Sequence, residues 1–344
     1  MRVETGMSPE LSTAAEQAQR AESLGYDGVM SPETTHDPFF PLVIAAEHTE
    51  RIRLGTGVAI SFPRSPMVVA NIGWDLQGYS GGRFQLGLGS QVKGHNERRF
   101  STAWTPPAPR MREYVLALKA IWNTWATGER LNFQGEHYNF TLMTPNFTPP
   151  PIDDPDIPVY ISAVGPAMCR VAGEVCDGLR LHGFLTPKYL EDVILPNVEK
   201  GLERSGRTLQ DFDLVGGGFI ASGDSDEEIR TAKQRVATQI SFYGSTRTYQ
   251  GVFDVHGWGD LTPKLHEMSL QGQWGAMSEE ISDEVLEAFA AIGKPEDAAD
   301  EVIKRFGDYC KTVSFGMPTP NSDEEQRARR IIARLHESGA VPAN

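Results

Sequence analysis

Residues 53–60 read Arg53-Leu54-Gly55-Thr56-Gly57-Val58-Ala59-Ile60, and the proline-punctuated segment Ser61-Phe62-Pro63-Arg64-Ser65-Pro66 follows directly. The first stretch predicts a buried strand that runs into irregular structure, yet glycines occupy positions 55 and 57 inside it. Glycine weakens a strand, so it usually marks a bulge or a place where a ligand approaches the backbone. A glycine that only relieves crowding in a barrel interior is the alternative, and this stretch alone leaves both interpretations open.

On both sides of this stretch, short apolar runs alternate with amphipathic segments of helix length. Strands are predicted near Val3, Gly28–Met30, Arg53–Ile60, Phe84–Leu88, Val159–Ala163, Gly178–Leu181, Leu214–Ile220 and Thr312–Phe315. Strands that alternate with helices indicate a parallel sheet with helical crossovers. About eight such units predict an α/β fold of the closed (β/α)8 TIM-barrel type. A doubly wound open sheet is the alternative fold.

Two segments interrupt the alternation and are expected to be insertions in a single domain that spans residues 1–344. The first covers about residues 129–158, and its aromatic and proline content predicts a small hairpin with an extended return. The second covers about residues 242–280 and is rich in glycine and aromatic residues. Because excursions of this length are often functional lids or helical elaborations, we expect an ordered lid there.

The overall charge and the cysteine content exclude several classes of function. The 344-residue chain has a formal net charge of −14, which argues against binding to nucleic-acid backbones or anionic membranes. Its three cysteines, Cys169, Cys176 and Cys310, have neither disulfide-framework nor zinc-ligand spacing. The start of the chain lacks an apolar signal core, and no apolar run reaches membrane-spanning length. We therefore expect a cytoplasmic protein without a metal site.

Candidate chemical groups follow the predicted strands, where the carboxyl ends of a barrel carry its active site. Glu33 and His36 follow the second strand, and a carboxylate with a histidine can serve as acid and base. Small residues join the fifth strand to a helix that is expected to start near Pro166. Backbone amides at such a helix start can bind a phosphate without a basic side chain. An ordinary turn explains the same residues, and both interpretations stay open here.

Four groups of residues carry a resemblance to a known family. They are residues 21–28 (AESLGYDG), 49–58 (TERIRLGTGV), 80–89 (SGGRFQLGLG), and 157–163 (IPVYISA) with 172–178 (AGEVCDG). In this order, the segments resemble those of the luciferase-like family of flavin and deazaflavin oxidoreductases. Within the family, they are most similar to the actinobacterial branch that uses coenzyme F420. The resemblance covers roughly the first 200 residues, and the closing unit from Pro295 to Phe315 fits it as well.

The resemblance implies a barrel with insertions and a non-prolyl cis peptide at Gly57-Val58. It further implies that the bulge at this bond backs the cofactor ring, that the loop after the fourth strand lies along the cofactor, and that the loop after the fifth strand takes its phosphate. The cofactor-binding residues implied are Gly57, Val58, Ala59, Ser90, Gln91, Val92, Lys93, Ala163, Val164, Gly165, Pro166, Ala167 and Met168.

The chain departs from the family pattern at three places. Where many relatives carry an Asp-His pair after the second strand, this chain offers Glu33 or His36 as the catalytic proton donor. Val193 stands where sugar-phosphate dehydrogenases of the family have a lysine, which argues against a sugar-phosphate substrate. The glutamate that relatives place after the fourth strand has no clear equivalent near Gln91.

The resemblance therefore implies an F420-dependent oxidoreductase that transfers a hydride between the deazaflavin C5 and an organic substrate. The substrate class stays open among ketones or alcohols, enones and nitroaromatics. An FMN-dependent monooxygenase of the same family and a non-catalytic deazaflavin-binding protein are the alternatives. We also expect a homodimer that binds a small-molecule substrate and neither nucleic acid nor membrane.

Overall fold

The computed structural model describes residues 1–339; the last five positions of the expected 1–344 domain lie outside the described residues. Within residues 1–339, eight parallel strands form a closed barrel. They are β1 (Arg2–Gly6), β2 (Gly28–Ser31), β3 (Arg53–Thr56), β5 (Phe84–Gly89), β8 (Val159–Ala163), β9 (Gly178–Leu181), β10 (Asp213–Gly216) and β13 (Thr312–Ser314). The pairing of β3 with β5, through Leu54 opposite Phe84, closes the ring and rules out the open doubly wound sheet.

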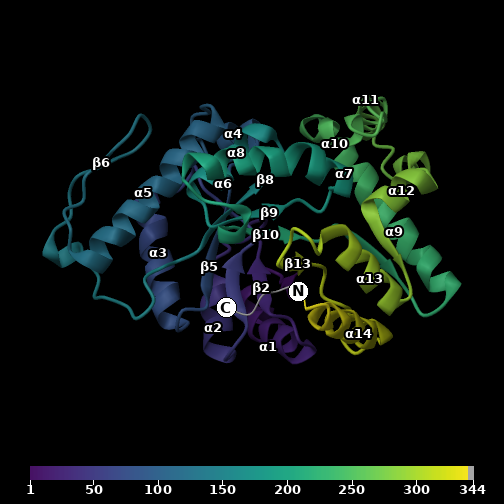
Figure 1. The fold of residues 1–344 in the computed structure, drawn as a ribbon, viewed down its shortest axis with the longest axis horizontal. Coiled ribbons are helices and arrows are strands. Elements are labelled where there is room, and N and C mark those ends of the chain that lie inside the picture. The colour runs from purple at the N-terminus through teal and green to yellow at the C-terminus, as the bar shows by residue number, and fades with distance from the viewer. Residues whose placement is uncertain (340–344) are drawn as a thin grey trace.

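Helices surround the strands on all sides in Figure 1, with α1 and α2 below, α3 and α5 at the left, α6 and α8 above, and α9, α13 and α14 at the right. The helices that cover the barrel are α1 (Ala14–Leu24), α2 (Phe40–His48), α3 (Pro66–Tyr79), α5 (Pro107–Thr127), α6 (Pro166–Val175), α8 (Leu195–Arg204), α9 (Asp226–Gly244), α13 (Pro295–Phe306) and α14 (Asp323–Glu337). Shorter elements lie between them: α4 (Lys93–Arg98), α7 (Pro187–Tyr189), the π-helix η3 (Leu190–Ile194), and the 3-10 turns η1 (Leu11–Thr13), η2 (Pro145–Phe147) and η4 (Leu209–Asp211).

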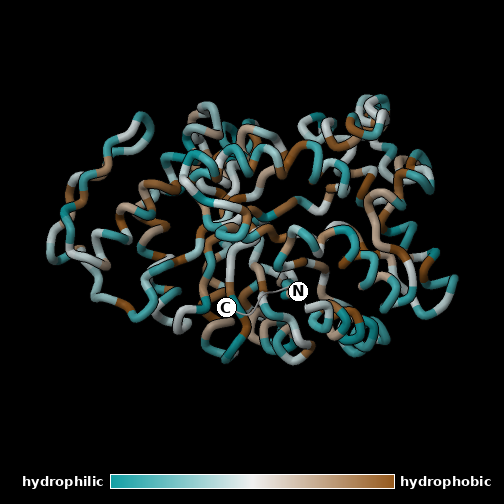
Figure 2. Tube along the Cα trace, in the orientation of Figure 1, coloured by the Kyte–Doolittle hydropathy of each residue, from teal (hydrophilic) through white to brown (hydrophobic). Residues whose placement is uncertain are grey.

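Local sequence signals explain several helix boundaries. Gly25 ends α1 in the left-handed conformation with φ of 98°, where glycine has no steric penalty. Ser225 and Glu228 form a reciprocal capping box at the start of α9. Trp122 and Trp125, three residues apart on α5, are both buried. Figure 2 shows hydrophobic and hydrophilic positions interspersed along the helices, with α14 mostly hydrophilic on its outer side.

The two segments predicted to be insertions contain elements of their own. The first contains the antiparallel hairpin of β6 (Phe133–Gln134) and β7 (Asn139–Phe140), which extends at the far left of Figure 1. The second is helical and contains the end of α9, η5 (Arg247–Tyr249), α10 (Gln250–Asp254), α11 (Leu261–Leu270) and η6 (Ala276–Glu280). The excursion closes through α12 (Asp283–Phe289).

Two of the predicted strands are interrupted. The run at 53–60 stops at residue 56 and resumes as β4 (Ala59–Ile60), which pairs with the end of β5. The run at 214–220 breaks at Gly217 and Gly218, whose φ angles are 153° and 73°. After this break the chain leaves the barrel as β11 (Phe219–Ser222) and pairs in parallel with β12 (Ala290–Gly293). The sequence did not predict β12, since its small residues follow α12 without a turn signal.

Candidate active site at the carboxyl end of the barrel

The strands are parallel, so the loops that follow them gather at one end of the barrel. The loop after β2 contacts the loop after β3 through the backbone: the Gly57 amide donates to the Ser31 carbonyl over 2.9 Å, and the Glu33 amide donates to the Val58 carbonyl over 3.3 Å. The peptide bond between Gly57 and Val58 is cis, as the family resemblance implies. The structure therefore places Glu33 beside the bulge that the resemblance assigns to the cofactor ring.

Packing inside the barrel requires both glycines of residues 53–60, Gly55 and Gly57. A Cβ at Gly55 would lie 2.7 Å from the Gln85 Cγ and 2.8 Å from the Met30 Sδ, and one at Gly57 would lie 2.9 Å from the Met30 Cβ. Real Cβ atoms do not approach other atoms so closely, so larger residues at either position would displace Met30 or Gln85. Crowding explains both glycines without a ligand, and the predicted cofactor contact of Gly57 remains a separate prediction.

The Glu33 side chain is held in an ion-pair cluster. Its carboxylate accepts hydrogen bonds of 2.7 Å from both the Ile60 amide and the Arg64 guanidinium, and its side chain is only 5% exposed. Arg64 also pairs with Asp37 over 2.8 Å. Burial alone would lower the pKa of Arg64, but Glu33 and Asp37 raise it, so the guanidinium stays charged. Glu33 thus ties the β2 loop to the segment after the bulge.

His36, the second predicted proton donor, is exposed and has no hydrogen-bond partner among residues 1–339. It lies in the same loop as Glu33, beside Asp37, whose carboxylate caps the Phe39 amide over 2.9 Å. The structure therefore brings the two candidates into one loop but gives them different surroundings: Glu33 is buried and paired, and His36 faces solvent.

The loop after β5 is ordered by a buried amide. The Asn96 side chain donates to the carbonyls of Ser90 over 2.9 Å and Val92 over 3.2 Å. Gln91 adopts φ of 56°, a left-handed conformation in which its own side chain accepts from the Val92 amide. Val92 and Lys93 are exposed. These residues therefore form a fixed rim segment at the same end of the barrel as the bulge.

The loop after β8 leads into α6 as predicted, with Pro166 as the first helical residue and Gly165 at the cap position. No side chain caps this helix, so its first amides are left to another partner. A Cβ at Gly165 would meet no atom within 4 Å, so the space in front of the loop is open. Tyr189 fixes the loop by donating a 3.1 Å hydrogen bond to the Val164 carbonyl. Open amides at a helix start fit an anionic group.

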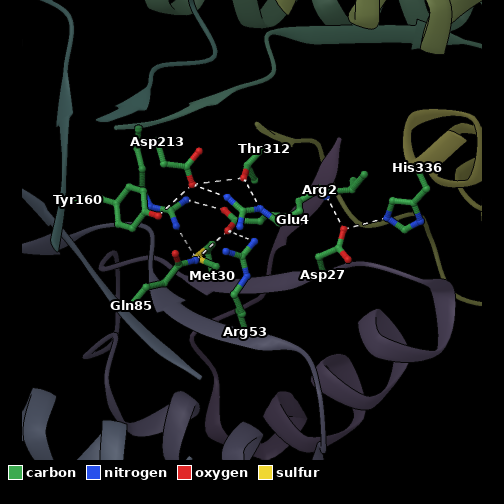
Figure 3. A network of polar contacts seen from close by, with 12 residues as sticks. Arg2, Glu4, Asp27, Met30, Arg53, Gln85, Tyr160, Asp213, Thr312 and His336 are labelled. Carbon is green, nitrogen blue, oxygen red and sulfur yellow. Dashed lines mark hydrogen bonds and ion pairs between the residues drawn. The ribbon is translucent and has the colours of Figure 1, made fainter. Parts of the chain in front are cut away.

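Below these loops, a buried charge network fills the barrel (Figure 3). Glu4 is 1% exposed and accepts hydrogen bonds of 2.8 Å from both Arg180 and Gln85. Arg180 also donates to the Met30 Sδ over 3.0 Å and lies over the Tyr160 ring at 5.2 Å. Burial alone would raise the pKa of Glu4, but the positive charges of Arg180 and Arg53 lower it overall. The charged residues Glu4, Arg53 and Arg180 of this network lie beneath the loops, and we refer to them as the ionised floor.

His182, a polar residue at this end of the barrel, was not among the residues predicted from the sequence. It follows β9 directly, and its Nδ1 accepts a 3.0 Å hydrogen bond from the Phe184 amide. Its ring packs against Tyr243 and Tyr249, with centroid distances of 4.6 Å and 4.9 Å. Burial lowers the pKa of His182 to about 4, so the imidazole is neutral at pH 7. A histidine directly after a predicted barrel strand was the signal available in the sequence.

Within residues 1–339, one group of potential metal ligands, Glu113, Glu136 and His137, lies between α5 and the insertion hairpin. The Glu113 carboxylate already accepts hydrogen bonds from the amides of Glu136 over 3.0 Å and His137 over 2.8 Å. These bonds explain the cluster as an anchor for the hairpin.

The comparison with protein families gives a match to the family described as luciferase-like monooxygenase, over residues 2–309. The chain belongs to the luciferase-like monooxygenase family. The uncharacterized protein Rv1360 of Mycobacterium tuberculosis is 46% identical over 305 residues, which cover 89% of this chain and 90% of that protein. The F420-dependent glucose-6-phosphate dehydrogenase of Intrasporangium calvum is 34% identical over 213 residues, or 57% of this chain and 61% of that enzyme.

The barrel also agrees with solved structures of the luciferase-like class. The coenzyme F420-dependent tetrahydromethanopterin reductase of Methanopyrus kandleri superposes with a TM-score of 0.79, at 20% identity, over 98% of this chain and 99% of that chain. This likeness confirms the predicted TIM-barrel fold of this luciferase-like protein. Within residues 1–339, no helix is both long and apolar enough to cross a membrane.

Proposed function

We propose that the chain is a coenzyme F420-dependent oxidoreductase that transfers a hydride between the deazaflavin C5 and an organic substrate. Relatives in the family are named as F420-dependent, among them the dehydrogenase that shares 34% identity over 213 residues. The observation in this structure that carries the proposal is the uncapped start of α6, which opens beside Gly165 at the carboxyl end of the barrel. The phosphate of such a cofactor would accept the hydrogen bonds that no side chain accepts from these amides.

The residues present fit such a cofactor. The amides near Ala167 and Met168 would hold the phosphate, while the loop from Ser90 to Lys93 would lie along the molecule. The bulge at Gly57-Val58 would support the ring, because Glu33 fixes that bulge through backbone and side-chain hydrogen bonds. When bound, the deazaflavin supplies the hydride chemistry, and the protein supplies position and electrostatics.

The group that transfers the proton accompanying the hydride is proposed to lie in the loop after β2. His36 faces solvent and can exchange a proton with water, whereas Glu33 is engaged with Arg64 and the Ile60 amide. In this proposal, Glu33 fixes the loop and His36 relays the proton. Tyr243, near the end of α9, and Tyr249, in η5, pack against the His182 ring and would cover that side of the site.

The substrate is proposed only as an organic molecule with a reducible or oxidisable carbon or nitro group. Val193 lies in the π-helix η3, where the family resemblance implies a lysine in sugar-phosphate dehydrogenases, so residue 193 supplies no cation for a sugar phosphate. We therefore favour substrates without a phosphate group.

Titration of the purified protein with F420 and, separately, with FMN tests the proposal. We expect saturable binding of F420 that is at least tenfold tighter than that of FMN, together with F420H2 oxidation in the presence of a substrate. Tight FMN binding with substrate-dependent oxygen uptake would replace the proposal by a flavin monooxygenase. F420 binding without turnover of ketones, aldehydes, enones or nitroarenes would indicate a deazaflavin-binding protein.

A further inference from the structure

His182 has the position of a residue that contacts substrate. It directly follows β9, in which Arg180 points into the barrel and contacts Glu4. Alternate residues of a strand share one face, so residue 182 continues the inward-facing row of Arg180 at the carboxyl end. The residue therefore stands above the ionised floor, at the end of the barrel where the loops gather.

The hydrogen bond from the Phe184 amide fixes the tautomer of His182. Because Nδ1 accepts this bond, the proton of the neutral ring resides on Nε2. Nε2 has no hydrogen-bond partner among residues 1–339, and it is not one of the fully buried polar atoms that lack partners. The ring thus presents one N–H donor that nothing in the described chain uses.

The surroundings of His182 are aromatic and uncharged. Tyr243 meets the imidazole edge-on at an interplanar angle of 83°, and Tyr249 meets it at 40°. Phe184 packs behind both tyrosines, with centroid distances of 6.4 Å and 6.1 Å. The pKa of His182 falls through burial alone, and no charged side chain contributes to the shift. The rings packed on the imidazole therefore offer an anionic substrate group no countercharge, whereas a neutral oxygen acceptor would find a donor in the His182 ring.

We propose that the Nε2–H group of His182 donates a hydrogen bond to the carbonyl or hydroxyl oxygen of an uncharged organic substrate, whose apolar part lies against Tyr243 and Tyr249. This rests on the proposed function for the reaction itself, but binding of the oxygen does not depend on the cofactor. A buried histidine used only for packing would leave the same ring contacts and no preference for an oxygen acceptor.

The experiment compares acetophenone with ethylbenzene, which has the same ring and chain length but no carbonyl. Binding to the wild type, His182→Phe and His182→Gln is measured by ligand-detected NMR, and the ring nitrogens of labelled histidine are followed at pH 7. For the wild type we expect a Nε2-protonated signal from residue 182 that shifts with acetophenone, and a preference for the ketone of about fivefold, as one neutral hydrogen bond provides.

His182→Phe should lose this preference while it still binds both aromatic probes, and His182→Gln, which keeps a donor, should retain part of it. His48→Gln serves as the matched control, since His48 is exposed on α2 and bonds only to the Ile44 carbonyl. An unchanged preference in His182→Phe, or no preference in the wild type, would overturn the assignment. Circular dichroism confirms that each variant is folded.

F420 titration of the same proteins separates this inference from the proposed function. Ketone preference without F420 binding would refute the proposed function and leave the role of His182 in place. F420 binding without ketone preference would refute the role of His182 and leave the proposed function in place.

Discussion

The Glu33 carboxylate and the Arg64 guanidinium form a 2.7 Å ion pair at the carboxyl end of the barrel, although 31 residues separate them in the chain. The same carboxylate oxygen accepts from the Ile60 amide. One side chain therefore joins the loop after β2 to the segment that follows the Gly57-Val58 bulge.

Removal of the Glu33 carboxylate should destabilise the protein strongly. Because Arg64 would be left partly buried with the more exposed Asp37 as its one acidic partner, beside the Ile60 carbonyl, we expect Glu33→Ala to lower the free energy of unfolding by about 3 kcal/mol. Urea denaturation measures the loss. Asp37→Asn is the matched control and should cost about 1 kcal/mol or less, since Asp37 is 34% exposed. Equal losses in both variants would contradict the role of Glu33 as the link between the loops.

Glu4 should make stability depend on pH. Its pKa in the folded protein lies below the ordinary value of 4.5 because Arg180 and Arg53 outweigh the effect of burial. A lowered carboxyl pKa adds stability that is fully present above pH 4.5 and is lost as the pH falls through the folded pKa. Glu4→Gln should cost about 3 kcal/mol at pH 7, and this difference from the wild type should shrink below pH 4.5. A difference that does not change with pH would argue against an ionised Glu4.

His182 should add a second pH dependence in a separate window. Burial lowers its pKa from 6.5 to about 4, so the unfolded chain binds more protons than the folded one between these values. The stability that the neutral ring contributes is therefore present above pH 6.5 and is lost as the pH falls towards 4. Denaturation of the wild type and His182→Gln at pH 7 and pH 5 measures it. The wild type should lose more stability than the variant, and parallel losses would contradict a depressed pKa.

Substitution by alanine should reduce stability at one glycine near the site and leave it unchanged at another. Gly55→Ala places a methyl group against Gln85 and Met30, and we expect a loss of about 1–3 kcal/mol through overpacking. Gly165→Ala meets no atom, so its thermal stability should match the wild type. If the start of α6 holds the cofactor phosphate, F420 affinity should fall in Gly165→Ala alone. Unchanged affinity there would remove the support that α6 gives to the proposed function.

The expected homodimer can be tested at an apolar groove between α3 and the first insertion. Met67, Leu142 and Phe147 line this groove, and the latter two are 77% and 78% exposed. Exposed apolar side chains of this size are typical of interaction surfaces. We expect a dimer in sedimentation equilibrium and a monomer for the double variant Leu142→Asp, Phe147→Asp. A monomeric wild type would refute the expectation.

The alternation of about eight strands with helices predicted the barrel, and the pairing of β3 with β5 decided it against the open sheet. The interruption at residues 57–58 was visible as glycines in the sequence, whereas the departure of the chain at Gly217 and Gly218 was not recognised. The pair of Glu33 with Arg64 could not be predicted, since it depends on the spatial meeting of two loops. His182 was overlooked for a similar reason: its aromatic neighbours come from a segment about 60 residues further along the chain.

The departure of the chain after β10 has a consequence for how such a protein diversifies. The excursion leaves through β11 and returns through β12, and these strands pair with each other from Phe219 opposite Ala290 to Ser222 opposite Gly293. The first and last strands of the excursion are thus hydrogen-bonded to each other, outside the hydrogen-bonded ring of the barrel. Within residues 1–339, no barrel strand pairs with β11 or β12, so we expect sequence changes between them to alter the side chains packed against His182, such as Tyr243 and Tyr249, and to leave the strand pairing of the barrel unchanged.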